Sequence, residues 1–317
     1  MRFRFTDEVE ALLTDVINDR QSGAAQIACK AADVIGAFAT SSFASDVATL
    51  HQGLRDLLQR MCYAHAVMAP LWNLREYILT VVEQNANLPV EQLCTRVTQA
   101  AVSFSRSIER RRNGVAQRAA NLITEGIVIL THSASSVVLA TLSLARSQGK
   151  RFRVLCTESH PGGEGVALCE ALRDAGVEVD LIADAMALPA MQRERCTMVL
   201  IGADAYAREG VVHKVGTWML ATSAQQLNIP VYSLGGTDKI MPSSAPPVTV
   251  LAYESRAYER MGDEQYDDEF TLELPYSFFW LFDVTPWSHI TMVITERGRL
   301  TPMRLLEWLE EGRQWGA

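Results

Sequence analysis

Apolar residues recur at helical spacing through the first 120 residues. Between Glu8 and Ile17 they fall three or four positions apart, so that they line one face of a helix. The same spacing predicts four more helices, at 24–38, 44–63, 70–84 and 90–121. Polar breaks at 19–23, 41–42 and 85–89 separate them. Residues 1–120 are therefore expected to form a helical N-terminal domain.

From Ile123 onward the pattern changes to short apolar runs that alternate with helical stretches. Strands are expected at 127–131, 152–157, 178–182, 197–201, 231–234 and 290–294. Helices are expected at 135–148, 163–175, 187–193, 214–227 and 302–314. This alternation is typical of an α/β fold with a doubly wound parallel sheet, here over residues 121–317. The proline-containing segment 241–280, with its acidic stretch at 263–269, is expected to be irregular.

Composition narrows the classes of function. Of the 317 residues, 48% are hydrophobic and 21% are charged, and the net charge of -8 argues against direct nucleic-acid binding. Six cysteines without a CxxC pair are expected to be buried free thiols of a reducing compartment. The N-terminus has no apolar signal core and no stretch reaches membrane-spanning length, so we expect a cytoplasmic protein with no membrane partner.

Charged residues follow two of the predicted strands. Asp204 comes just after the strand at 197–201, and Lys239 follows the strand at 231–234. His213 and Lys214 fall at the expected start of the helix at 214–227, where free N–H groups favour an anion. Open α/β sheets bind ligands at the carboxyl ends of their strands. We therefore expect a small phosphorylated ligand, with Lys214 and Lys239 on its phosphate.

Polar residues also follow the first strand. Ser133, Ser135 and Ser136 open the next helix, where their hydroxyl and N–H groups are suited either to a phosphate or to simple N-capping. His132 is either an acid–base group or a histidine packed at the strand end. Asp204 is suited to a general base or to an acceptor for sugar hydroxyls.

The loop after the second strand holds Glu158 and His160, followed by two glycines that would let a ligand approach the backbone. A plain loop before a helix is the alternative. Asp184, after the third strand, is equally suited to capping a helix. Because no GxGxxG follows the first strand, no dinucleotide is indicated, and we expect neither cofactor nor metal.

The blocks ILTHSASSVV, CTESHPGGEG, GADAYAREGVVHKVGT, FDVTP and VITERGRLTP, in this order between 129 and 302, resemble a known superfamily. It unites the alpha, beta and delta subunits of translation initiation factor 2B with isomerases of methylthioribose-1-phosphate and ribose-1,5-bisphosphate. The resemblance implies a helical N-terminal domain, a Rossmann-like C-terminal domain and a homodimer formed through the latter.

Several residues depart from the isomerase pattern. Ser133 stands where the isomerases have a proton-transfer cysteine, and a hydroxyl is far less acidic than a thiol. The aspartate of that chemistry is kept as Asp204. His160 replaces a phosphate-binding arginine, and the family's Arg-Gly pair is Ser22-Gly23, with Arg20 close enough to substitute. His213 replaces the asparagine of an Asn-Lys pair.

The alpha-type regulatory subunit shows a similar pattern of serines after Thr-His and of Glu-Ser in the second block. The resemblance therefore favours a regulatory protein that binds a phosphorylated sugar or nucleotide. Two alternatives stay open. One is an active aldose–ketose isomerase in which Asp204 is the base and His132 or His160 the acid. The other is a scaffold with a vestigial pocket.

Overall fold

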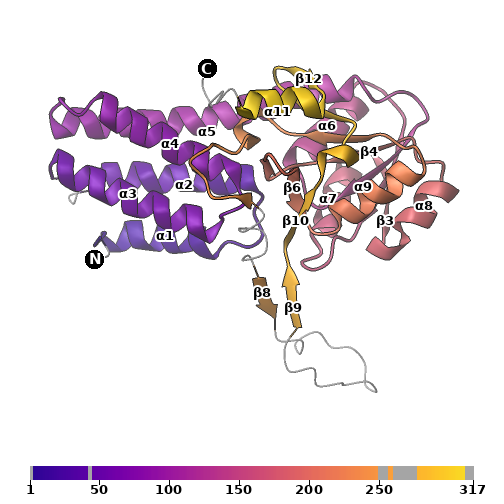
Figure 1. The fold of residues 1–317 in the computed structure, drawn as a ribbon, viewed down its shortest axis with the longest axis horizontal. Coiled ribbons are helices and arrows are strands. Elements are labelled where there is room, and N and C mark those ends of the chain that lie inside the picture. Colours follow the sequence, from indigo (N-terminus) through magenta and orange to yellow (C-terminus); the bar gives the residue numbers. More distant parts are fainter. Residues whose placement is uncertain (1–2, 42–44, 249–255, 260–276, 311–317) are drawn as a thin grey trace.

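The computed structural model describes residues 3–41, 45–248, 256–259 and 277–310. Its first part consists of helices packed side by side, drawn in indigo and purple in Figure 1. The helices are α1 (Asp7–Asn18), α2 (Ala24–Ala39), α3 (Val47–Ala64), α4 (Ala69–Gln84) and α5 (Val90–Ala120). They lie within a few residues of the helices expected from the apolar spacing.

Capping and close packing account for the placement of these helices. The Thr6 hydroxyl accepts the N–H of Val9 at 3.3 Å, and the Asp46 carboxylate accepts that of Thr49 at 2.8 Å, so both side chains satisfy first-turn donors. Gly53 lets α3 approach α2, since a Cβ atom there would lie 2.1 Å from the Phe38 ring. Phe38 is fully buried in the core of the helical part.

The second part is a seven-stranded sheet covered by helices. Its strand order is β12-β11-β7-β4-β1-β2-β3, and all neighbours are parallel except β11 and β12. The strands are β1 (Val128–His132), β2 (Arg153–Thr157), β3 (Glu178–Ile182), β4 (Met198–Ile201), β7 (Val231–Leu234), β11 (Met292–Thr295) and β12 (Gly298–Leu300). The helices are α6 (Ser136–Ser147), α7 (Glu164–Asp174), α8 (Ala187–Arg193), α9 (Thr217–Gln226) and α11 (Pro302–Glu310). The predicted α/β class is confirmed.

The chain adds strands first on one side of β1 and then on the other, so the order of strands changes direction between β1 and β4. It first adds β2 and β3 on one side of β1, and then returns to add β4, β7 and β11 on the other side. The crossovers on the two sides lie on opposite faces: α6 and α7 share one apolar core with the sheet, and α8, α9 and α11 share the other. The carboxyl ends of β1 and β4 therefore flank a topological switch point, where such sheets bind ligands.

Helix α5 belongs to the cores of both parts. Leu93, Val97 and Phe104 pack in the helical core, whereas Val115 and Ala119 pack under the sheet beside α6. At about 1.5 Å per residue, its 31 residues extend for roughly 46 Å, enough to span both. The helical part is thus fixed to the sheet by a continuous helix.

Two smaller sheets correct the expectations for the C-terminal half. Strands β10 (Phe282–Thr285), β6 (Val211–Lys214) and β5 (Ala205–Tyr206) form an antiparallel sheet, so the helix expected from residue 214 begins only at Thr217. Within the segment expected to be irregular, β8 (Arg256–Glu259) pairs with β9 (Ser277–Trp280), and both project from the body in Figure 1. The acidic stretch 263–269 lies outside the described residues. None of the described helices has the length and apolar character needed to cross a bilayer.

Candidate functional site

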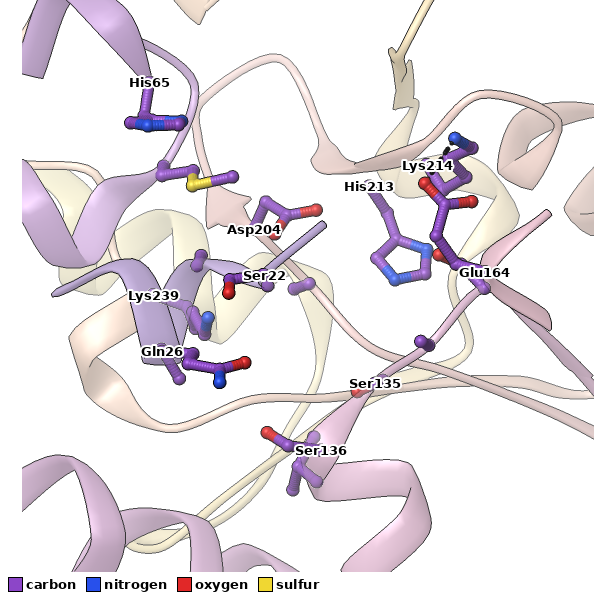
Figure 2. Close-up of a pocket in the computed structure, with 18 of the residues that line it drawn as sticks. Ser22, Gln26, His65, Ser135, Ser136, Glu164, Asp204, His213, Lys214 and Lys239 are labelled. Atoms are coloured by element: carbon purple, nitrogen blue, oxygen red, sulfur yellow. Dashed lines mark hydrogen bonds and ion pairs between the residues drawn. The ribbon is translucent and has the colours of Figure 1, made fainter. Parts of the chain in front are cut away.

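A cavity of about 710 Å³ lies between the helical part and the carboxyl edge of the sheet, at the switch point beside β1 and β4. Of the residues predicted for a site, nine line it: Arg20, Gly23, Ser133, Ser135, Ser136, Asp204, His213, Lys214 and Lys239. They come from the loop before α2, the start of α6, the end of β4, strand β6 and the short turn after β7. Figure 2 shows most of these side chains gathered around one hollow.

Asp204 follows β4 and lies between the two parts of the protein. Its backbone is fixed on both sides: its N–H donates to the Val212 carbonyl at 2.8 Å, and its carbonyl accepts the Ala69 N–H at 3.1 Å. Burial raises the pKa of its carboxyl, while the Lys239 ammonium and the Ala24 N–H act in the opposite direction. Asp204 is therefore a carboxyl group whose proton is retained to a higher pH than usual, the property of an acid–base group.

His213 lies on β6 and presents a neutral ring to the cavity. Burial, followed by the nearby His132, Lys239 and Lys214, lowers its pKa to about 3. Its Nδ1 is 3.0 Å from the Thr217 hydroxyl, which itself donates to the Lys214 carbonyl at 2.6 Å. Because that hydroxyl proton is already used, Nδ1 must carry the ring proton and Nε2 is left as an acceptor.

The start of α6 provides the hydroxyl groups of the cavity. Ser133 has a left-handed φ of 61°, and its N–H donates to the Ser159 hydroxyl at 2.7 Å. Ser135 is the N-cap of α6, although its bond with the Val138 N–H is long, at 3.5 Å. Gly202 leaves room beside it, since a Cβ atom there would lie 2.4 Å from the Ser135 hydroxyl and 3.1 Å from Nε2 of His213. The absence of a side chain at Gly202 thus lets the Ser135 hydroxyl and the His213 ring lie close to the end of β4.

The helical part contributes the opposite wall. The start of α2 faces the cavity with Gly23 as its N-cap, and because glycine has no side chain to cap that end, the Ala24 N–H is directed to the Asp204 carboxyl instead. The turn before it is held by Asp19, whose carboxylate accepts the N–H groups of Gln21 and Ser22 and pairs with Lys30 at 2.7 Å. Burial alone would raise the pKa of Asp19, but these partners outweigh it and the pKa is lowered.

Comparison with known proteins identifies the family to which this fold belongs. The model of the Initiation factor 2 subunit family matches residues 20–302. The chain belongs to this family. A putative translation initiation factor eIF-2B subunit 2-like protein of Pyrococcus abyssi is 31% identical over 94% of this chain and 98% of its own length. A ribose 1,5-bisphosphate isomerase of Haloferax volcanii is 30% identical over 97% of this chain and 93% of its own.

A solved structure agrees with these sequence relatives. The crystal structure of a Pyrococcus horikoshii translation initiation factor eIF-2B superposes with a TM-score of 0.81 at 29% identity, covering 95% of this chain and 99% of that one. The Initiation factor 2 subunit family therefore includes proteins named for translation and proteins named for sugar-phosphate isomerisation. Membership of this family establishes the fold of the chain. Its function has to be inferred from the residues of the site.

Among the described residues, three that were predicted for the site do not line the cavity, namely His132, Glu158 and His160. His132 is buried behind it: Nε2 is 2.9 Å from the Val215 carbonyl and Nδ1 is 2.6 Å from the Thr157 hydroxyl. A carbonyl can only accept, so Nε2 carries the proton. Burial lowers the pKa of this ring, so His132 is a neutral histidine that joins the end of β1 to the turn before α9.

The other two are Glu158 and His160, in the loop after β2. The His160 side chain is 69% exposed, and its Nε2 lies 3.6 Å from the Glu158 carboxylate. The loop itself is anchored by Asp184, whose two oxygens accept the N–H groups of Ser159 and His160, each at 2.7 Å. Asp184 thus caps a loop, and His160 is directed outward in this family member.

Sequence reasoning missed four charged residues of the cavity wall, namely Asp19, Arg112, Glu164 and Asp238. Glu164 is in the block CTESHPGGEG, just after the two glycines. Its position at the start of the helix predicted at 163–175 could have marked it as a site residue. Arg112 lies on α5, in the part of the chain where the sequence pattern indicated only helices. Its position at the cavity depends on how α5 packs on the sheet, which no local pattern reveals.

Proposed function

We propose that this protein binds a phosphorylated sugar or nucleotide in the cavity at the switch point, and that it acts as a regulatory homologue of the initiation-factor-2B alpha type. The observation that carries the proposal is the hollow of about 710 Å³, whose size is in the range of small-molecule sites. It combines cationic side chains with hydroxyl, imidazole and carboxyl groups, a mixture suited to phosphate and sugar together.

The phosphate would lie near Lys239 and the serines that open α6. Lys239 is a buried ammonium, 8% exposed, on the turn after β7. The N–H groups at the start of α6 and at the start of α2 add positive ends of two helix dipoles from opposite walls. Arg20 at the rim supplies further positive charge. Asp204 and Nε2 of His213 would accept hydrogen bonds from sugar hydroxyls.

A second candidate is aldose–ketose isomerisation of a sugar phosphate. It is favoured by the raised pKa of Asp204, because a carboxyl that exchanges its proton nearer neutrality is suited to moving a proton between adjacent sugar carbons. Ser133 stands where the resemblance places a cysteine, and His132 is engaged on both nitrogens. Because the second proton-transfer group is the weaker part of this candidate, binding is the function that the geometry supports better.

A thermal-shift screen tests binding. The purified protein is mixed with ribose 1,5-bisphosphate, methylthioribose 1-phosphate, ribose 5-phosphate and AMP. A ligand at 100-fold over its dissociation constant adds about 2.7 kcal/mol to the free energy of unfolding, which gives a clear rise in Tm. Lys239→Ala should remove most of the rise, whereas Arg151→Ala, an exposed cation at the opposite edge of the sheet, should leave it unchanged. No shift with any phosphorylated ligand would overturn the proposal.

Turnover separates the two candidates. The same sugar phosphates are incubated with the protein, and ketose formation is followed by NMR. The regulatory function predicts no ketose above the rate without protein. Formation of a ketose that is lost in Asp204→Asn would establish the isomerase instead.

The predicted homodimer belongs to the same proposal. Trp218 and Met219 on α9 are 44% and 51% exposed, beside the Asp283 carboxylate that caps that helix. An apolar patch of this kind on the sheet domain is a fitting surface for a second copy. Native mass spectrometry should give twice the mass of 35.1 kDa, and Trp218→Ser should shift the population toward the monomer.

A further inference from the structure

One end of the cavity is occupied by an ion pair. Lys214, predicted to hold a phosphate, donates to the Glu164 carboxylate at 2.7 Å and to the Pro161 carbonyl. The lysine side chain is 5% exposed and that of Glu164 is 24% exposed. Figure 2 shows both on one side of Asp204, with Lys239 and Ser22 on the other. The positive charge of Lys214 is therefore matched by a carboxylate of the protein itself.

The second oxygen of Glu164 lacks a hydrogen-bond donor. Oε2 is buried, yet among the described residues it has no hydrogen-bond donor. A buried carboxylate oxygen without a donor is costly, so this atom favours a ligand group that carries a proton. A sugar hydroxyl satisfies that requirement. A phosphate dianion offers only acceptors and adds charge of the same sign.

Glu164 is also placed so that it does not swing aside freely. It is the first residue of α7, and its carboxylate lies against the backbone of Gly162, where a Cβ atom would be only 2.7 Å from Oε1. Its negative charge at the start of a helix is favoured by the helix dipole. Displacing it would cost the bond to Lys214 as well.

The charged residues around the whole cavity also favour a ligand with a single phosphate group. Among the described residues that line it are four cationic side chains, Arg20, Arg112, Lys214 and Lys239, and four carboxyl side chains, Asp19, Glu164, Asp204 and Asp238. A phosphate monoester carries a charge of about -1.5 to -2 near neutral pH. Because Lys214 is already paired with Glu164, its charge is not free for a second phosphate, and the lining is suited to one such group, held by Lys239.

We propose that Glu164 is a specificity-determining residue that closes the Lys214 end of the cavity to phosphate. The ligand is therefore singly phosphorylated and presents a hydroxyl group to Glu164. This inference rests on the proposed function, since it assumes that the cavity takes a phosphorylated sugar. It reassigns Lys214 from a phosphate ligand to the residue that holds Glu164 in place.

The test compares ribose 5-phosphate with ribose 1,5-bisphosphate by isothermal titration calorimetry. We expect the native protein to bind the monophosphate at least tenfold more tightly. Glu164→Gln keeps the size of the side chain and removes its charge, so affinity for the bisphosphate should rise at least tenfold while that for the monophosphate changes less than threefold. Glu164→Ala should shift the preference in the same direction. This second variant shows that the change in Glu164→Gln comes from loss of the carboxylate and not from hydrogen bonds of the new amide.

Glu158→Gln is the matched control. It removes one carboxylate from the same loop, where Glu158 is paired with exposed His160 outside the cavity lining, so it should leave both affinities unchanged. Tighter binding of the bisphosphate by the native protein would overturn the inference and leave the proposed function standing. So would an equal gain for both ligands in Glu164→Gln. Failure of both ligands to bind the native protein and all variants, together with no thermal shift from AMP or methylthioribose 1-phosphate, would overturn the proposed function itself.

Discussion

Asn73 on α4 is predicted to be a main point of attachment between the helical part and the cavity. Its buried amide donates to the carbonyls of Asp238 and Ile240, at 2.8 Å and 2.9 Å, on either side of Lys239. Asn73→Ala removes both donors at once. Each buried acceptor left without a partner costs about 1–3 kcal/mol, so the free energy of unfolding should fall by about 2–5 kcal/mol.

Urea denaturation followed by circular dichroism measures this loss, which should lower the transition midpoint with little change in the m-value. Asn85→Ala is the control, because its amide makes one bond, to the Val81 carbonyl at 2.8 Å, at the end of the same helix. It should cost less than about 1 kcal/mol. If Asn73→Ala falls within about 0.5 kcal/mol of the native protein, as ordinary surface substitutions do, the two bonds are not the attachment inferred here.

Four further predictions concern stability. Gly36 lies inside α2 with open space around it, so Gly36→Ala should raise the free energy of unfolding by about 0.5–1 kcal/mol. Gly165→Ala should prevent or severely weaken folding in the same urea assay, since its Cβ atom would lie 1.8 Å from the Thr157 carbonyl oxygen. Burial raises the pKa of Asp283 to about 6, although two N–H groups oppose the rise. The folded protein then binds this proton more tightly than the unfolded chain, so this group should lower stability by about 1–2 kcal/mol as pH rises from 4 to 6, and Asp283→Asn should remove that part of the slope. Asp204→Asn, which removes a carboxyl with a pKa raised by burial, should leave Tm at pH 7.5 unchanged or higher while the ligand-dependent shift is lost.

The sheet and its order of elements could be predicted because the central strands contain short apolar runs. Ile129, Leu155 and Val199 belong to such runs, and all three are buried in the central strands. Parallel strands connected by helices need only local patterns to be found. The placement of Asp204 and the serines of α6 at one cavity followed from this topology, since the ends of parallel strands share an edge.

The errors lie where a long-range contact decides the structure. Residues 211–214 were expected to lead into a helix, but they form β6 because β10, about seventy residues further along the chain, pairs with them. Lys214 was expected to face a free anion, and its partner Glu164 is fifty residues away. For His132 the sequence left an acid–base group and a packed histidine open, and the contacts of its ring with Thr157 and Val215 correspond to the packed one. Each of these partners is invisible to a local sequence pattern.

The turn that holds Lys239 shows how the two parts of the protein act on one site. The Thr237 hydroxyl accepts from Arg111 of α5 at 2.7 Å and donates to Glu296, in the turn between β11 and β12, at 2.5 Å. Asn73 of α4 holds the other side of the same turn. The position of the Lys239 ammonium therefore depends on how the helices pack against the sheet. A phosphate bound to Lys239 must in turn stabilise that packing, because binding and the packed arrangement favour each other by the same free energy. Under the proposed function, a ligand in this cavity would stabilise the packing of the two parts of the chain without any chemical step, as a regulatory protein requires.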